Sequence, residues 1–273
     1  AATLLAGVML WLPTRHLSRD LNIRDGFMVT ALFWVVLGFF GAIRLWLTPD
    51  LSLTPADAIF ESISGLTTTG ATVITGLDKL PQSLLFYRQL LQWLGGIGII
   101  VLAVAILPML GIGGMQLYRA ESAGPSKDRK LTPRITSTAK ALFGIYLLLT
   151  IACAASYFAA GMSMFHAICH AFSTVAIGGF STHDASLGHY EQNRVLLVSS
   201  VFMLLSAINF GLHFVALQRR NLRVYARDSE TAFFITVIAS ATIVVCCLLL
   251  TTETLNFEDS VIHGLFQLSL IHI

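Results

Sequence analysis

The segments TTTGAT at residues 67–72 and AIGGFST at residues 176–182 decide the fold of this 273-residue chain. Each follows a short, mostly apolar stretch, and each lies between two hydrophobic runs long enough to cross a bilayer. When Gly70 is aligned with Gly179, the sequences on both sides of the two glycines also come into register. The chain therefore contains a repeated unit.

The repeat continues into the residues that precede each glycine. The segment DAIF at 57–60 aligns with HAIC at 166–169, and a third copy of this opening, HGLF, begins at His263. Each unit of about 100 residues reads as a spanning helix, a short re-entrant helix, a glycine-centred strand and a second spanning helix. We therefore predict an all-α integral membrane protein in which this unit is repeated around a pore and is incomplete in its third copy.

The central glycines indicate what the strands do. Non-helical backbone is tolerated inside a membrane only where protein buries it or where it lines a water-filled cavity. A ring of backbone carbonyl oxygens can replace the hydration shell of a monovalent cation. Aiming successive carbonyls at one axis requires backbone angles that are disfavoured for residues with a side chain, so a glycine is expected at the centre. Gly70 and Gly179 meet this requirement, and the pattern predicts a potassium-channel-like filter.

The composition agrees with a membrane protein. Hydrophobic residues make up 55% of the chain and charged residues 12%, and the mean hydropathy of +0.76 exceeds what a soluble core requires. A net charge of +2 is too small to indicate a nucleic-acid partner. The four cysteines lie in apolar surroundings without the spacing of a zinc site, so we expect buried, unreactive thiols.

The hydrophobic runs and the helix-capping residues predict the elements. Thr54 suits an N-cap and Pro55 a first helical turn, so a short helix is expected from Pro55 to Leu66. A second short helix is expected at 164–175, and a third begins at Phe257. Spanning helices are expected at 27–47, 84–107, 141–160, 195–217 and 231–251.

The charges predict the orientation. The three loops that this topology places inside carry 13 of the 17 Lys and Arg side chains; the other four are Arg44, Lys79, Arg88 and Arg194. This bias places both filters toward the outer face. Nine of the fifteen acidic residues, Glu61 among them, are assigned to the outer side. There they either enrich cations at the entrance or only keep the loops soluble.

Two histidines suggest a metal site as an alternative. His166 and His170 stand four residues apart, a spacing that can bind a metal on a helix. Their counterparts in the first copy, however, are Asp57 and Glu61. We therefore favour polar residues that hydrogen-bond neighbouring backbone or face an outer vestibule.

The remaining motifs favour packing over catalysis. The sequence GGIG at 95–98 lies in the middle of a span and lacks the context of a phosphate loop, so close helix packing explains it better. Ser64 and Ser173 are equivalent in the repeat and are expected to pack the short helices. Since no nucleophile elbow or dinucleotide fingerprint is present, the sequence does not indicate an enzyme.

The two glycine segments resemble those of the potassium-uptake subunit of bacterial Trk/Ktr systems, of the TrkH/TrkG type. A loop of the same family is similar to the segment at 113–140, GGMQLYRAESAGPSKDRKLTPRITSTAK. The resemblance covers essentially the whole chain. It implies potassium uptake across the bacterial inner membrane through four such repeats in one multi-pass polypeptide. It also implies K⁺ as the transported ion without an organic cofactor, a homodimer in membrane lipid, and a nucleotide-binding cytoplasmic regulatory ring protein of the TrkA type.

The repeat and the resemblance together assign the site residues. The backbone carbonyls of the glycine segments are expected to bind potassium, and the residues at their ends are expected to support the strands. The expected potassium-binding residues are Thr68, Thr69, Gly70, Ile177, Gly178 and Gly179. The expected supporting residues are Thr67, Ala71, Thr72, Ala176, Phe180 and Ser181.

The repeat also divides the chain. We expect the tail of a preceding membrane helix at 1–13, a first repeat at 20–110, a cytoplasmic loop at 111–140, a second repeat at 141–218 and the start of a third at 231–273. Extending the repeat places the third filter glycine beyond Ile273, so we expect a truncated product. Two hypotheses follow: part of a potassium pore, or a non-conducting assembly or interaction fragment of a membrane transporter.

Overall fold

A computed structural model describes residues 7–9, 11–13, 23–106, 131–190, 192–252 and 256–271. This part of the chain is helical and contains no β-strand, so it is the all-α membrane protein that the sequence predicts. The helices are α2 (Ile23–Trp46), α3 (Pro55–Leu66), α4 (Gln82–Ile106), α6 (Leu131–Ala159), α7 (Met164–Ala176), α8 (Asn193–Ala207), α9 (Phe210–Arg219), α10 (Arg223–Arg227), α11 (Ser229–Thr251) and α12 (Phe257–Ile271).

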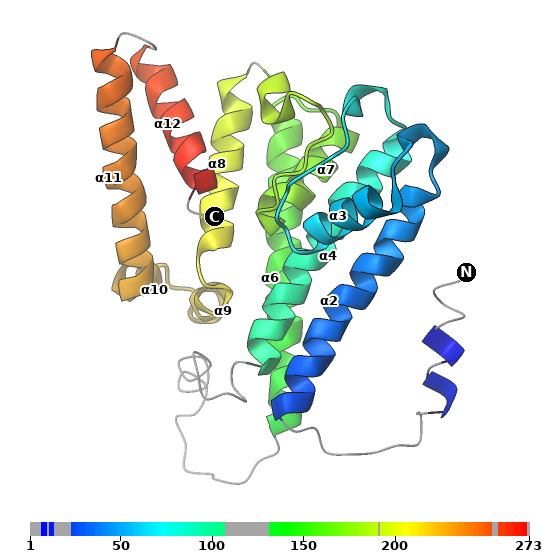
Figure 1. Ribbon diagram of the computed structural model, residues 1–273. Coiled ribbons are helices and arrows are strands. Elements are labelled where there is room, and N and C mark those ends of the chain that lie inside the picture. The colour runs from blue at the N-terminus through cyan, green and yellow to red at the C-terminus, as the bar shows by residue number, and fades with distance from the viewer. Residues whose placement is uncertain are drawn as a thin grey trace, which may run out of the picture.

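The helices follow the order of the predicted repeat. In the first copy, the short α3 lies between α2 and α4, and in the second, the short α7 lies between α6 and the pair α8 and α9. Both short helices pack against α4, and Figure 1 shows each of them among longer helices and followed by an extended segment that returns toward one end of the molecule. Helices α11 and α12 pack together at the edge formed by α8.

Local capping explains where the two short helices begin. The hydroxyl of Thr54 accepts a hydrogen bond from the backbone N–H of Asp57, and the carboxylate of Asp57 accepts one from the backbone N–H of Thr54, each at 3.2 Å. Pro55 occupies the first turn, where its missing N–H is not needed. In α7, Ser163 caps the backbone N–H of His166. The start of both helices is confirmed.

The predicted span at 195–217 is wrong as a single helix. Helices α8 and α9 meet at an angle of 91°. Ile208 has an extended backbone, and the side chain of Asn209 caps the N–H of Gly211, which starts a new helix in a new direction. The ring of His213 lies 2.8 Å from the carbonyl oxygen of Leu205, so the bend is also fastened by a side chain.

Two other boundaries bear on the sequence analysis. Helix α6 begins at Leu131, within the segment expected to be a loop up to residue 140. Pro133 does not prevent this, because a proline is tolerated in the first turn of a helix. The remainder of the expected loop, at 111–130, and most of the expected helix tail at 1–13 lie outside the described residues.

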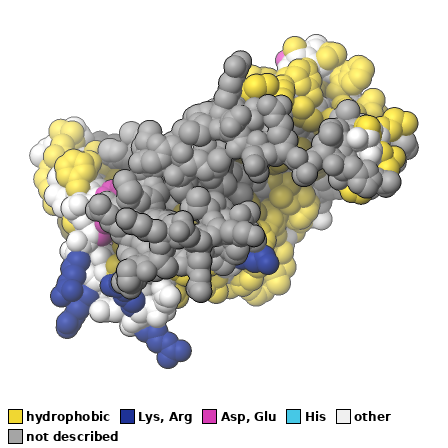
Figure 2. Space-filling view, turned by 90° about the horizontal axis from the view of Figure 1, so that it is seen from below, with side chains coloured by type: hydrophobic (Ala, Val, Ile, Leu, Met, Phe, Trp, Pro, Cys, Tyr) yellow, Lys and Arg dark blue, Asp and Glu magenta, His cyan; other side chains and the backbone are white. Residues whose placement is uncertain are grey.

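The surface fits a bilayer with a basic inner face. Among the described helices, the segments Ala139–Ala159 and Ser229–Thr251 are each long and apolar enough to cross, as is the bent pair of α8 and α9 taken together. Helices α2 and α11 expose large apolar side chains, such as Phe39 and Phe233. Seen from below, the molecule carries exposed Arg side chains on α9, α10 and the turn between them (Figure 2), namely Arg219, Arg220, Arg223 and Arg227.

Candidate functional site

The two glycine-centred strands, 67–72 and 176–182, meet backbone to backbone. Gly70 and Gly179 have φ angles of +76° and +80°, in the left-handed region that favours glycine. A Cβ atom placed on Gly70 would collide with the carbonyl oxygen of Gly178 in the other strand, whereas one placed on Gly179 would meet no atom within 4 Å. The conformational reason for a glycine at both positions is therefore confirmed, and Gly70 is further required by the contact between strands.

Each strand leaves its short helix through the same hydrogen-bonded turn. After α3, the N–H of Thr69 donates to the carbonyl of Ser64 at 2.9 Å. After α7, the equivalent N–H of Gly178 donates to the carbonyl of Ser173, also at 2.9 Å. This long bond encloses a shorter one in each copy, from Thr68 to Gly65 and from Ile177 to Thr174. The pattern is a Schellman motif, so Ser64 and Ser173 hold the strands through their carbonyls.

This turn places two β-branched residues in an unfavourable conformation. Thr68 and Ile177 have φ angles of +56° and +55°, which are outliers for residues with a branched Cβ. Sequence reasoning missed them because the left-handed position of a Schellman motif is usually a glycine. With Gly70 and Gly179, they put every second residue of each strand at positive φ. That alternation lets consecutive carbonyls face one side instead of alternating as they do in an ordinary strand.

The strand carbonyls divide into free and occupied groups. Within the described part of the chain, no residue donates a hydrogen bond to the carbonyls of Thr68, Thr69, Gly70, Ile177 and Gly179. The carbonyls of Ala71, Gly178 and Ser181 accept hydrogen bonds from Ser64 at 2.6 Å, Gln92 at 2.7 Å and Arg88 at 3.2 Å. Gly178, which the sequence placed among the ion ligands, thus differs from the other five in that its carbonyl already accepts a hydrogen bond.

A buried ion pair fixes the first strand. The guanidinium of Arg88 on α4 lies 2.8 Å from the carboxylate of Glu61 on α3, with side chains 1% and 0% exposed. The same carboxylate accepts hydrogen bonds from the hydroxyl of Thr72 at 2.9 Å and the N–H of Val73 at 3.0 Å. Because charges at membrane depth are costly unless paired, these groups lock the strand to both helices.

This pair bears on the assignment of two charges. The sequence counted Arg88 with the cations of the outer half and Glu61 with the outer acids; the structure adds that both side chains are buried. The signal that would have found them is an acid and a base that both fall within membrane-embedded segments, where such residues usually pair with one another.

Helix α4 also holds the second strand. Arg88 donates to the carbonyl of Ser181, and its guanidinium lies 4.4 Å from the centre of the Phe180 ring. One turn further along α4, Gln92 donates to the carbonyl of Gly178 and accepts from the N–H of Phe180 at 3.1 Å. Residues four apart share one helix face, so Arg88 and Gln92 present a single polar face to both strands.

The predicted supporting residues contribute in different ways. The hydroxyl of Thr72 joins the buried ion pair, as described above, whereas that of Thr67 donates to the carbonyl of Ile63 at 2.8 Å and shares a hydrogen bond with Thr69. Ser181 acts mainly through its carbonyl, and its hydroxyl accepts from the N–H of His183. The side chain of Ala176 lies against Gly96 of α4, which agrees with close packing at the GGIG sequence.

The two histidines of α7 attach to the end of the second strand. Ring nitrogens of His166 and His170 lie 2.8 Å and 3.2 Å from the hydroxyl of Thr182. Their partner is a side chain, whereas the sequence favoured a hydrogen bond to neighbouring backbone or a position facing an outer vestibule. His170 occupies the place in the second copy that Glu61 occupies in the first, and both side chains tie a short helix to the strand that follows it.

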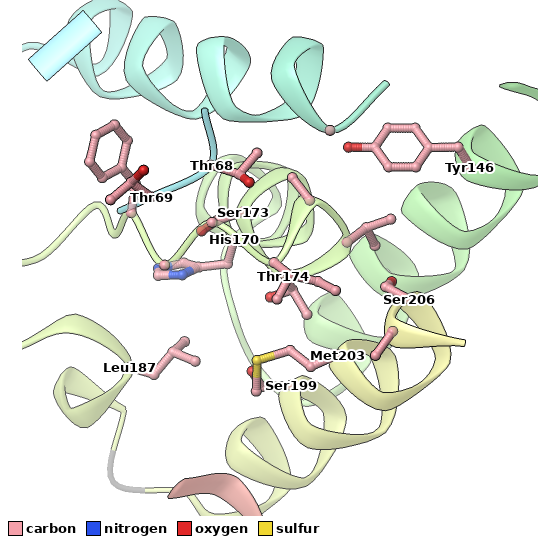
Figure 3. A pocket seen from close by; sticks show the side chains of 18 of the residues that line it. Thr68, Thr69, Tyr146, His170, Ser173, Thr174, Leu187, Ser199, Met203 and Ser206 are labelled. Atoms are coloured by element: carbon pink, nitrogen blue, oxygen red, sulfur yellow. The ribbon is translucent and has the colours of Figure 1, made fainter. Parts of the chain in front are cut away.

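Two cavities adjoin the strands. A cavity of about 820 Å³ is lined by residues 67–69 and 176–180 and by α6, α7 and α8. Figure 3 shows Ser199, Met203 and Ser206 of α8 facing the α7 side of this cavity. Within the described residues, the buried hydroxyl of Ser206 has no protein partner, so it is available to water. A second cavity, of about 480 Å³, is lined by Gly70, residues 74–77, Gly179 and the loop at 181–184.

The chain resembles known proteins over nearly its whole length. Residues 1–269 match the family model TrkH, described as a cation transport protein. The chain is 55% identical over 261 residues to the Trk system potassium uptake protein TrkH of Halomonas elongata, which covers 96% of this chain and 54% of that protein. It is 44% identical over 256 residues to the Trk system potassium uptake protein TrkG of Escherichia coli strain K12, covering 94% of this chain and 53% of that protein.

A solved structure has the same fold. The crystal structure of the potassium transporter TrkH from Vibrio parahaemolyticus superimposes with a TM-score of 0.89 at 48% sequence identity, covering 98% of this chain and 55% of that one. The chain spans about half the length of the relatives that it matches.

Proposed function

The chain belongs to the TrkH family of cation transport proteins, and we propose that its two filter strands form part of a potassium-selective pathway for uptake across the bacterial inner membrane. The family is one of transporters, not of enzymes. The chain spans about half the length of the relatives whose names state potassium uptake. We therefore also propose, and do not carry over from those relatives, its potassium specificity, its ion-binding residues and its partners.

One observation carries the proposal. Five carbonyls on two adjacent strands accept no hydrogen bond from the described residues, while the neighbouring carbonyls of Ala71, Gly178 and Ser181 are all occupied. The five residues with free carbonyls are half-buried or exposed and line the two cavities beside the strands, so their carbonyl oxygens are accessible to water or to an ion. A dehydrated monovalent cation is a natural partner for such oxygens. Of the six predicted ion ligands, the five with free carbonyls are Thr68, Thr69, Gly70, Ile177 and Gly179.

The arrangement supports a simple pathway. A hydrated ion enters the 480 Å³ cavity beside Gly70 and Gly179, exchanges water for strand carbonyls, and leaves into the 820 Å³ cavity with the available hydroxyl of Ser206. Potassium moves inward down its electrochemical gradient, and carbonyl sites of moderate strength let it leave as well as enter. The buried network around Arg88 keeps the strands from collapsing when no ion is bound.

The partners follow from the inner face. The exposed arginines on and between α9 and α10 give this end a positive surface. Such a surface suits an acidic contact on a cytoplasmic partner, and we assign it to a nucleotide-binding ring protein of the TrkA type. The naming of the relatives as members of a Trk system supports a complex with several components. We also propose a homodimer, embedded in lipid.

Potassium-dependent growth tests the proposal. An uptake-deficient bacterium would express the chain alone or the chain joined to the second half of the Halomonas elongata relative. We expect the joined protein to restore growth at low potassium and Gly70→Ala to abolish it, because the new methyl group collides with the second strand. Gly144→Ala is the matched control, since Gly144 is exposed and its added methyl meets no atom.

The same experiment distinguishes the alternative. Growth supported by the joined protein but not by the chain alone would make this polypeptide a non-conducting assembly fragment. Failure of a joined protein that reaches the membrane would exclude the potassium pathway. Equal growth with Gly70→Ala would exclude the filter assignment.

A further inference from the structure

Three side chains with metal-ligating atoms converge where the loops after the two strands meet. Asp78 lies in the turn Leu77–Lys79, His183 follows the second strand, and His189 ends the turn Ser186–His189. One carboxylate oxygen and one ring nitrogen from each histidine lie within 4.8 Å of one another. In a tetrahedral zinc site with bonds of about 2.1 Å, the ligand atoms lie about 3.4 Å apart. Small side-chain rotations therefore bring these three atoms into coordinating positions.

The local contacts favour this arrangement. Asp78 and the Nδ1 atom of His183 form a hydrogen bond, which lowers the pKa of the carboxyl and keeps it ionised at neutral pH. The rings of His183 and His189 are parallel, with centres 3.7 Å apart. His189 is exposed, so its ring is free to rotate toward an ion. Asp184 adds a second carboxylate nearby, held by the N–H of Gly76 at 2.9 Å.

The ligand types decide which ion fits. Two imidazoles and one carboxylate, with the fourth position open to water, are a common zinc set. Calcium and magnesium prefer oxygen ligands alone, and a filter for potassium uses backbone carbonyls. We propose that Asp78, His183 and His189 form a binding site for a divalent transition-metal ion, with zinc as the best match.

The site lies beside the ion pathway. His183 and Asp184 line the same 480 Å³ cavity as Gly70 and Gly179. The second part of the proposal rests on the proposed potassium pathway: a zinc ion bound at this site inhibits potassium uptake from the outer side. Its charge opposes the entry of potassium, and its bonds join a loop of the first repeat to a loop of the second.

Metal binding is tested without transport. The purified chain in detergent is titrated with zinc in competition with a chromophoric chelator. We expect one zinc ion per chain, and weakening of about 10–100-fold or more in Asp78→Asn and His189→Gln, since losing a ligand should cost at least as much as losing a second-shell partner. His263→Gln, on α12, is the matched control and should bind as the unchanged chain does.

A conservative variant protects the test against misfolding. His189→Cys supplies a new ligand at the exposed position, so its cobalt complex should show a thiolate-to-cobalt charge-transfer band that the unchanged chain lacks. Equal zinc affinity in the unchanged chain and His189→Gln, or no such band in His189→Cys, would overturn the site.

The transport step has its own readout. In the joined protein, external zinc should reduce potassium uptake, and His189→Gln should remove this inhibition while leaving uptake without zinc unchanged. Zinc binding without inhibition would reject the second part only. No uptake in any variant, with zinc still bound, would reject the proposed function and leave the metal site standing.

Discussion

A methyl group on Gly70 collides with the carbonyl of Gly178, whereas the same group on Gly179 has open space. Both glycines have positive φ, so alanine at either position costs about 1–2 kcal/mol of conformational strain. Gly70→Ala must in addition push two backbones apart. We therefore expect a larger fall in Tm for Gly70→Ala than for Gly179→Ala, measured by thermal unfolding of the purified chain in detergent. Equal falls would show that the strands are not in contact.

Replacing Ile177 with glycine should destabilise the protein less than a glycine substitution in an ordered segment usually does. The left-handed backbone of Ile177 costs about 1–2 kcal/mol, and glycine removes this strain. The gain offsets the roughly 0.5–1 kcal/mol that glycine loses in conformational entropy. We expect Ile177→Gly to leave the Tm nearly unchanged.

Ala176→Gly is the control for this prediction. Ala176 is the last residue of α7 and is not at positive φ, so glycine there should lower the free energy of unfolding by about 0.5–1 kcal/mol. A fall in Tm for Ile177→Gly as large as that for Ala176→Gly would contradict the strained turn.

At this scale the sequence predicts the glycines but not the strained residues. Gly70 and Gly179 carry a recognisable requirement for positive φ. Thr68 and Ile177 reach the same region only because the hydrogen bonds of the Schellman motif and the contact between strands hold them there. Nothing in the chemistry of a β-branched residue indicates that conformation.

Helix α4 carries two glutamines with opposite expected roles. Gln92 satisfies the carbonyl of Gly178 and the N–H of Phe180, so Gln92→Leu leaves two buried backbone groups unpaired. Each costs about 1–3 kcal/mol. Gln89 is equally buried, and among the described residues its amide has no partner. We expect Gln92→Leu to lower the Tm and Gln89→Leu to maintain or raise it, in the same unfolding assay. A similar loss in both variants would contradict the assigned contacts.

The pair of Glu61 and Arg88 should show strong coupling. Removing one partner leaves a buried, unpaired charge, which costs about 3–5 kcal/mol. We expect Arg88→Met and Glu61→Gln each to be strongly destabilising, and the double variant to lose less than the sum of the two. A double-mutant cycle on the free energy of unfolding measures the difference. Simple additivity would indicate that the two groups do not interact.

Features of the helices that depend on neighbouring residues could be predicted from the sequence, whereas features that depend on distant residues could not. The starts of α3 and α7 follow from capping residues next to them in the sequence. The 91° bend between α8 and α9 lacks a proline, and its one local sign, Asn209 as an N-cap, lies within an apolar run that reads as continuous. The role of Arg88 depends on residues 27 and 93 positions away, which no local pattern reveals.

The orientation of the whole molecule is testable by labelling. The arginines on and between α9 and α10 lie at the end opposite the turn that contains Asp50 (Figure 1). In a Cys247→Ser background, which removes the exposed cysteine, we expect Asp50→Cys to react with a membrane-impermeant maleimide applied to whole cells. Arg223→Cys should react only after the cells are opened. Labelling of both from outside would contradict the positive-inside assignment.

At the scale of the molecule, the sequence predicts most of the architecture. Repetition and hydropathy give the order of long and short helices because each copy encodes them locally. The repeat does not predict how the copies differ. The first strand is held by an ion pair. The second is held by histidines of α7 and by Arg88 and Gln92 of α4, a helix of the first copy.

The contacts between α4 and the second strand can form only late in synthesis of the chain. Gln92 finds its partner Gly178 only 86 residues later, and Arg88 finds Ser181 only 93 residues later. At about 5–20 residues per second, a ribosome needs about 4–17 s to make the intervening 86 residues. Throughout this interval α4 carries an amide group without its final partners. The polar face of α4 is therefore complete only after the second strand has emerged, so any factor that shields polar groups in nascent membrane helices acts within this interval.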